Sequence, residues 1–91
     1  MKIYKYPLKL KERQVIKVNY YNVLSIIEQN GELIAYVPCM DFISNNEMEF
    51  MILGTGQEAP DDIDKFSFVQ TVQMKNGFVW HVFYRPFYEE G

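Results

Sequence analysis

Residues 23–40, VLSIIEQNGELIAYVPCM, contain the clearest turn of the chain, because Asn30-Gly31 separates two apolar segments. Asn-Gly is the favoured centre of a two-residue type I′ hairpin loop, in which both central residues need a positive φ. The sequence therefore predicts an antiparallel hairpin that pairs Gln29 with Glu32, Ile27 with Ile34 and Ser25 with Tyr36.

Residues 66–85, FSFVQTVQMKNGFVWHVFYR, repeat this pattern around Asn76-Gly77. The same loop predicts pairs between Met74 and Val79, Val72 and His81, and Gln70 and Phe83. One face of this hairpin then carries Phe68, Val72, Met74, Val79, His81 and Phe83, and the opposite face carries Val69, Phe78, Trp80, Val82 and Tyr84.

Both faces of this second hairpin are apolar, and a chain of this size rarely buries both. We expect one face to pack in the core and the other to contact a second subunit or a partner. This reasoning predicts a homo-oligomer whose interface contains Phe78, Trp80, Val82 and Tyr84.

The other strand candidates are residues 2–6, 14–18 and 47–53. In residues 47–53, Glu47 and Glu49 alternate with Met48, Phe50 and Ile52, the period of a half-buried strand. Pro7 ends the first strand or confines it to a sheet edge. The segment APDDIDKF, residues 59–66, permits one helical turn with Pro60 at its first position. The fold class is therefore all-β, a small antiparallel sandwich or barrel of about six or seven strands with at most one short helical turn.

The composition indicates one globular domain spanning residues 1–91, because hydrophobic residues make up 48% and charged residues 23% of the chain. No apolar run approaches the length that spans a bilayer, and the first residues contain no apolar segment of signal-peptide length. We therefore expect a soluble, cytoplasmic protein that does not bind a membrane.

Charge is distributed unevenly. Residues 1–17 carry six basic residues and one acid, net +5, whereas the remaining residues carry three basic residues and eleven acids, net −8. The overall charge of −3 argues against sequence-specific nucleic-acid binding. The basic segment would hold an anionic ligand, pair with a neighbouring subunit, or form a solvated strand edge.

Tyrosines accompany these basic residues, and tyrosine rings stack on bases while lysine and arginine contact phosphate. The alternative is that they are half-buried strand residues. The candidate ligand-binding residues, with a nucleotide as the ligand, are Tyr4, Lys9, Lys11, Arg13, Tyr20 and Tyr21. The acidic remainder would suit a basic partner protein, and its candidate contact residues are Glu47, Glu49, Glu58, Asp61, Asp62 and Asp64.

The sequence from Gly54 to Ala59 matches the G-x-G-x-x-(G/A) dinucleotide fingerprint, but that motif must open a helix. Pro60 follows immediately and a new strand begins near Phe66, so we expect the glycines to turn the chain out of the sheet. No cofactor is predicted.

Cys39 and His81 are the only residues of their types, so a zinc site is not expected and no metal is predicted. A buried structural role suits Cys39, and a hydrogen-bonded core or interface role suits His81. No nucleophile motif is present, which favours a non-enzymatic protein.

Four segments occur in an order that resembles a family of small phage and prophage proteins carried as a domain of unknown function: KIYKYPL, QNGE, FMILGTG with PDD, and FVWHVF. The resemblance covers most of the chain, except residues 19–23 and 41–46. It implies a viral genome in a bacterial host, but assigns no catalytic residue: Gly54, Gly56, Pro60, Asp61, Asp62 and His81 are members of its motifs only.

These observations lead to a functional expectation. The chain is expected to be a phage-encoded, non-enzymatic protein that inhibits a bacterial host or defence protein by direct binding. The alternatives are an oligomer that sequesters a nucleotide immune signal, and a minor structural or assembly protein of the virion.

Overall fold

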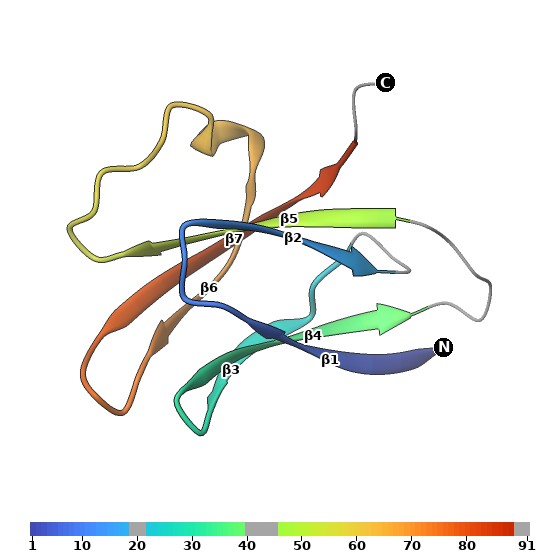
Figure 1. Cartoon of the computed structure of the whole chain (residues 1–91), viewed down its shortest axis with the longest axis horizontal. Helices are drawn as coiled ribbons and strands as arrows, with labels where there is room; N and C mark the ends of the chain where they lie inside the picture. Colours follow the sequence, from blue (N-terminus) through green and yellow to red (C-terminus); the bar gives the residue numbers. More distant parts are fainter. Residues whose placement is uncertain (19–21, 40–45, 89–91) are drawn as a thin grey trace.

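The computed structural model describes residues 1–18, 22–39 and 46–88. These residues form two antiparallel sheets, which confirms the all-β fold class (Figure 1). The elements are β1 (Lys2–Leu8), β2 (Arg13–Val18), β3 (Ser25–Gln29), β4 (Glu32–Cys39), β5 (Asn46–Gly54), a 3-10 turn η1 (Ile63–Lys65), β6 (Ser67–Gln73) and β7 (Val79–Phe87).

Sheet A has the strand order β1-β4-β3 and sheet B the order β2-β5-β7-β6. Consecutive strands β1 and β2 therefore belong to different sheets, and each is an edge strand. At the opposite side of the molecule β3 approaches β6, where the backbone amide of Ile26 donates to Gln70 Oε1 at 2.9 Å. This bond joins the two sheets on that side.

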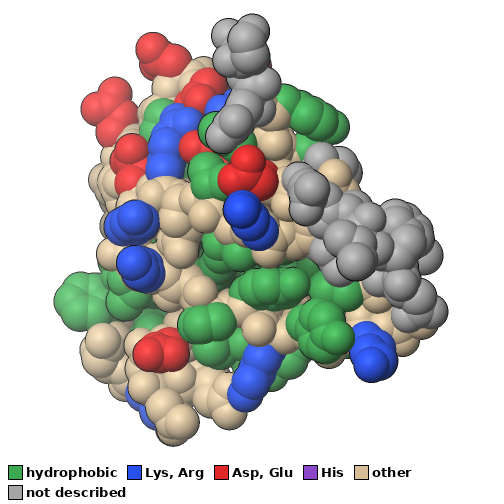
Figure 2. Space-filling view, turned by 45° about the vertical axis from the view of Figure 1, so that its right-hand side comes forward, with side chains coloured by type: hydrophobic (Ala, Val, Ile, Leu, Met, Phe, Trp, Pro, Cys, Tyr) green, Lys and Arg blue, Asp and Glu red, His purple; other side chains and the backbone are tan. Residues whose placement is uncertain are grey.

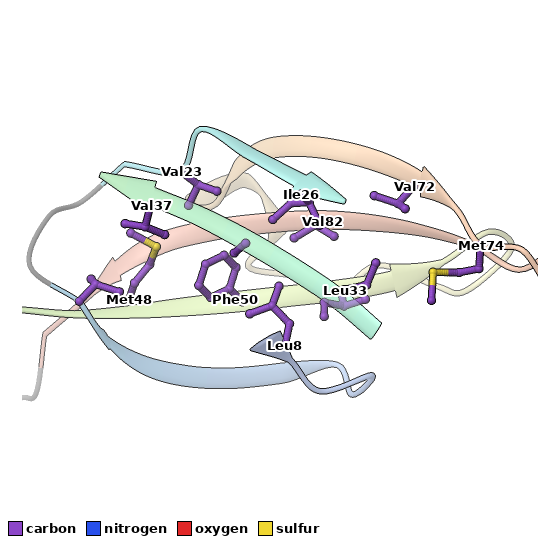
Figure 3. Close-up of a cluster of buried hydrophobic side chains, with 13 residues drawn as sticks. Leu8, Val23, Ile26, Leu33, Val37, Met48, Phe50, Val72, Met74 and Val82 are labelled. Carbon is purple, nitrogen blue, oxygen red and sulfur yellow. The ribbon is translucent and has the colours of Figure 1, made fainter. Parts of the chain in front are cut away.

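The main hydrophobic core fills the space between the sheets (Figure 3). Ile26, Leu33 and Val37 contribute from sheet A, and Phe50 and Val82 contribute from sheet B, all fully buried. Each such side chain contributes about 1.5–3 kcal/mol by leaving water. The core therefore fixes the two sheets face to face.

The β3–β4 hairpin has the predicted loop and register. Asn30 and Gly31 both adopt a positive φ, 53° and 82°, as a type I′ turn requires. The three predicted pairs all form: Gln29 with Glu32, Ile27 with Ile34 and Ser25 with Tyr36.

The predicted register of the β6–β7 hairpin is wrong by one residue, because Val72 pairs with Trp80 and Gln70 pairs with Val82. The Gly77 amide donates to the Met74 carbonyl at 2.9 Å, and the Met74 amide donates to the Phe78 carbonyl at 2.8 Å. The loop thus has three residues and ends on a left-handed glycine, a common alternative to the two-residue loop.

This shift changes which side chains share a face, because neighbouring strand residues point to opposite sides. Val72 and Met74 join Val82 in the main core, whereas the prediction put them on the face of His81 and Phe83. A bulge between Phe68 and Gln70 also interrupts the regular pairing of β6 with β7.

Residues 55–66 cover part of the outer face of sheet B. Phe66 packs there on Met51 and Leu53, with Ile63 and Phe83 against this second, smaller cluster. The predicted helical turn exists, but it begins at Ile63 and not at Pro60. The outer apolar face at Phe83 is therefore covered by the same chain, which removes part of the argument for an oligomer.

Candidate functional site

An open groove lies between the edge strands β1 and β2, because these strands belong to different sheets. Its volume is about 350 Å³. The groove is lined by Tyr6, Pro7, Lys9, Lys11, Gln14, Val15 and Ile16. This feature is named the β1–β2 groove.

The turn that closes one end of this groove is held in place by Gln14. Its Oε1 accepts the Lys9 amide proton at 2.9 Å, and its Nε2 donates to the Lys9 carbonyl at 2.7 Å. The Lys11 amide also donates to the Lys9 carbonyl, at 2.9 Å. These bonds fix the backbone from which both groove lysines project.

The rim of the groove is positively charged. Lys9 and Lys11 are exposed, and within the described part of the chain neither forms an ion pair. The nearest acid in the sequence, Glu12, accepts a hydrogen bond from Gln57 Nε2 at 2.9 Å on the neighbouring loop. The two lysine charges therefore remain available to an anionic group.

The remainder of the groove is largely apolar. Tyr6 and Ile16 are half-buried and pack against the main core, and Val15 is 42% exposed. Burial, reinforced by a contact of 3.5 Å with the Cys39 Sγ, raises the pKa of Tyr6 to about 12. The Tyr6 hydroxyl therefore stays neutral at neutral pH, and the groove combines an apolar floor with a cationic rim.

A charge network lies on the outer face of sheet B. Arg13 donates to both carboxylate oxygens of Asp62, one of them at 3.0 Å, and lies 3.6 Å from Glu49. Arg85 donates to Glu49 at 2.8 Å. Both guanidinium groups also lie over the ring of Phe66, at 5.5 Å and 4.6 Å from its centroid. The network therefore ties residues 55–66 to the sheet.

Hydrogen bonding within this network shifts two pKa values. The bonds from Arg13 hold the pKa of Asp62 below its usual value, and the same contact raises the pKa of Arg13. Asp62 therefore stays ionised at neutral pH and its charge is balanced within the chain.

The predicted acidic face is divided between two roles. Glu49 is buried, so its interpretation as a partner contact is wrong. Asp62 is half-buried and paired with Arg13, and its contact with a partner stays a prediction. The exposed acids are Glu58, Asp61 and Asp64, and Glu47 is half-buried opposite Lys17. On the face that Figure 2 shows, acidic and basic side chains lie next to one another.

The predicted ligand-binding residues are brought together only in part. Lys9 and Lys11 line the β1–β2 groove, whereas Arg13 belongs to the charge network and Tyr4 is exposed elsewhere on β1. Tyr20 and Tyr21 lie outside the described residues. Sequence reasoning missed Gln14 and Ile16, which become groove residues only because β1 and β2 join different sheets.

The predicted subunit interface needs one correction. Val82 is fully buried between the sheets, so it cannot contact a second subunit in the folded chain. Trp80 and Tyr84 are half-buried against the same core, and Phe78 is 64% exposed. Homo-oligomerisation stays a prediction, now supported chiefly by the exposed ring of Phe78.

Cys39 and His81 both have structural partners. Cys39 is buried, as predicted. His81 accepts or donates hydrogen bonds at 2.9 Å with Thr55 Oγ1 through Nε2 and with Thr71 Oγ1 through Nδ1. It shares the outer face of sheet B with Phe83, but not with Val72 as the predicted register required. His81 thus links strand β6 to the loop that follows β5.

The glycine segment forms a sharp turn, as predicted. Gly56 has a φ of 88°, and the Gln57 amide donates to the Gly54 carbonyl at 3.1 Å. The Gly54 amide donates to Gln57 Oε1 and the Thr55 amide to the Val79 carbonyl. These amides are engaged within the protein and would not cradle a phosphate.

The described residues contain no group of three or more His, Cys, Asp or Glu side chains arranged to hold a metal ion. Among the same residues no helix is long and apolar enough to cross a membrane.

Neither a curated protein nor a solved structure matches the chain. A family model does match, over residues 1–90, and its description is "Domain of unknown function (DUF7352)". With nearly every residue inside that match, the chain belongs to the DUF7352 family.

Proposed function

We propose that this chain is a non-enzymatic binding protein that inhibits a bacterial host or defence protein by direct contact, and that it acts through the β1–β2 groove. The phage setting is part of the proposal and comes from the resemblance of four sequence segments. The single observation that supports the binding site is a pair of lysines, Lys9 and Lys11, that have no acidic partner among the described residues and lie above an apolar floor.

The β1–β2 groove combines unpaired charge with apolar surface, and this combination favours it over the acidic loop as the contact surface. Two of the six acids predicted to face a partner are already used by the charge network. Unpaired charge at a rim accelerates association and selects partners of opposite sign, whereas charges paired within the chain do neither. We therefore place the partner at the basic groove.

Nucleotide sequestration has weaker support. Of the four described residues predicted for it, only Lys9 and Lys11 line the groove, and the amides of the glycine turn are bonded within the protein. A nucleotide panel tests this alternative, because a ligand at 100 times its dissociation constant adds about 2.7 kcal/mol to stability. We expect no change in Tm with cyclic nucleotides.

The main experiment is quantitative capture from a bacterial host lysate with three tagged proteins: wild type, K9E/K11E and K2E/K65E. Lys2 lies at the end of β1 remote from the groove, and Lys65 lies in η1, so the control changes net charge equally. We expect wild type and the control to recover the same stoichiometric partner and K9E/K11E to lose it. Equal recovery by all three proteins would overturn the groove assignment.

A further inference from the structure

The edge strand β2 is open to a further strand. Among the described residues it pairs only with β5, over six consecutive residues and without a bulge. An exposed strand edge presents unpaired backbone groups, and peptide-binding domains use such edges to add a strand from a partner. β2 therefore offers backbone hydrogen bonds beside the β1–β2 groove.

The opposite wall of the groove is less suited to this pairing. β1 contains Pro7, which has no amide proton and blunts a strand edge. β2 contains no proline, and its half-buried Ile16 and exposed Val15 provide apolar contact on both sides of the edge. Strand addition is thus favoured on β2.

Charge specifies the chemistry of the incoming strand. Lys9 and Lys11 lie at the groove and have no acidic partner in the described ranges of the chain, and Gln14 holds their turn in place. Lys17 also lies on β2, but Glu47 is its cross-strand neighbour. Side chains of an added strand alternate between the groove and the outer face, so those that enter the groove meet the two lysines.

We propose that β2 accepts an extended acidic segment of a partner protein as an additional strand of sheet B, with acidic side chains at Lys9 and Lys11. This inference rests on the proposed function and specifies its partner. Single-stranded nucleic acid is the competing occupant, but among the described residues that line the groove Tyr6 is the only aromatic one, which provides little stacking surface.

The test uses capped synthetic peptides of six residues, the length of β2. One alternates Glu and Val, a second alternates Lys and Val, and a third has the acidic sequence with N-methyl groups on alternate backbone amides. We expect the unmethylated acidic peptide to bind at least about tenfold more tightly than either of the others. K9E/K11E should lose this preference and K2E/K65E should keep it.

Each contrary result has a separate meaning. Equal binding of the methylated and unmethylated acidic peptides would overturn strand addition while leaving a charge-dependent groove, and hence the proposed function, intact. Tighter binding of an oligothymidylate than of the acidic peptide would replace the peptide with nucleic acid. Both proposals would be overturned if none of the peptides bound and if K9E/K11E captured the partner as well as wild type did.

Discussion

Two regions that carry basic side chains from the same short segment differ in how those charges are used. Arg13 on β2 is paired with Asp62 and Glu49, acids that lie far away in the sequence, and it packs over Phe66. Lys9 and Lys11, a few residues earlier, face an open groove without acidic partners among the described residues. The first region stabilises the fold, and the second remains free for binding.

The contrast shows why net charge alone is a poor guide to a binding surface. The acidic part of the chain suggested a contact for a basic partner, yet two of its members, Glu49 and Asp62, balance Arg13 and Arg85. Charges that are neutralised inside the fold attract nothing outside it. Lys9 and Lys11 differ from the other exposed charges in that both line the β1–β2 groove.

The largest expected effect on stability comes from Phe66, whose ring lies under both Arg13 and Arg85. Phe66→Ala should lower the free energy of unfolding by about 3 kcal/mol, because it empties the centre of the smaller cluster. Urea unfolding measures this change. Phe78→Ala removes an exposed ring and is the control, with an expected loss below about 1 kcal/mol. Equal losses would mean that residues 55–66 are not anchored through Phe66.

The second-largest effect on stability is expected for Glu49, the acid that both Arg13 and Arg85 contact. Glu49→Gln should cost about 2 kcal/mol, because it leaves Arg85 and Arg13 short of one carboxylate at a buried position. Glu58→Gln changes an exposed acid by the same chemistry and should stay within about 0.5 kcal/mol. If the two variants unfold at the same urea concentration, the network contributes nothing to stability.

Lowering the pH should weaken the charge network, because it protonates Asp62. Its folded pKa lies below its unfolded value, so its contribution is complete above the ordinary carboxyl pKa of about 4 and disappears as pH falls through the folded value. The wild type should therefore lose more stability than Asp62→Asn between about pH 5 and about pH 3. Parallel acid profiles of the two proteins would contradict this assignment.

The smallest effect on stability belongs to the groove. K9E/K11E should leave the free energy of unfolding within about 0.5 kcal/mol of wild type, because both side chains are exposed and form no ion pair in the described part of the chain. Thermal and urea unfolding check this value. A loss comparable to that of Glu49→Gln would place the lysines among the residues that hold the fold together.

Local rules predicted one hairpin fully and the other only in part. Asn30-Gly31 and Asn76-Gly77 are the same dipeptide, but the first forms a two-residue loop and the second ends a three-residue loop. Both loops are compatible with Asn-Gly, and the choice depends on which face the core requires. For the second hairpin the core selects the register that buries Met74.

The candidate site depends on topology that the sequence does not display. Strands that follow each other often pair, yet β1 and β2 join different sheets and leave a groove between them. The partnership of Arg13 with Asp62 spans most of the chain and has no local signature. Sequence reasoning could identify the groove lysines as candidates, but it could not separate them from Arg13.

The central claim is that the groove lysines serve binding and not folding. Its most direct test measures, on the same K9E/K11E preparation, the affinity for the acidic alternating peptide and the free energy of unfolding. We predict that affinity falls by at least about tenfold while the free energy of unfolding stays within about 0.5 kcal/mol of wild type. Unchanged affinity, or a loss of affinity that only accompanies a loss of stability, would contradict the claim.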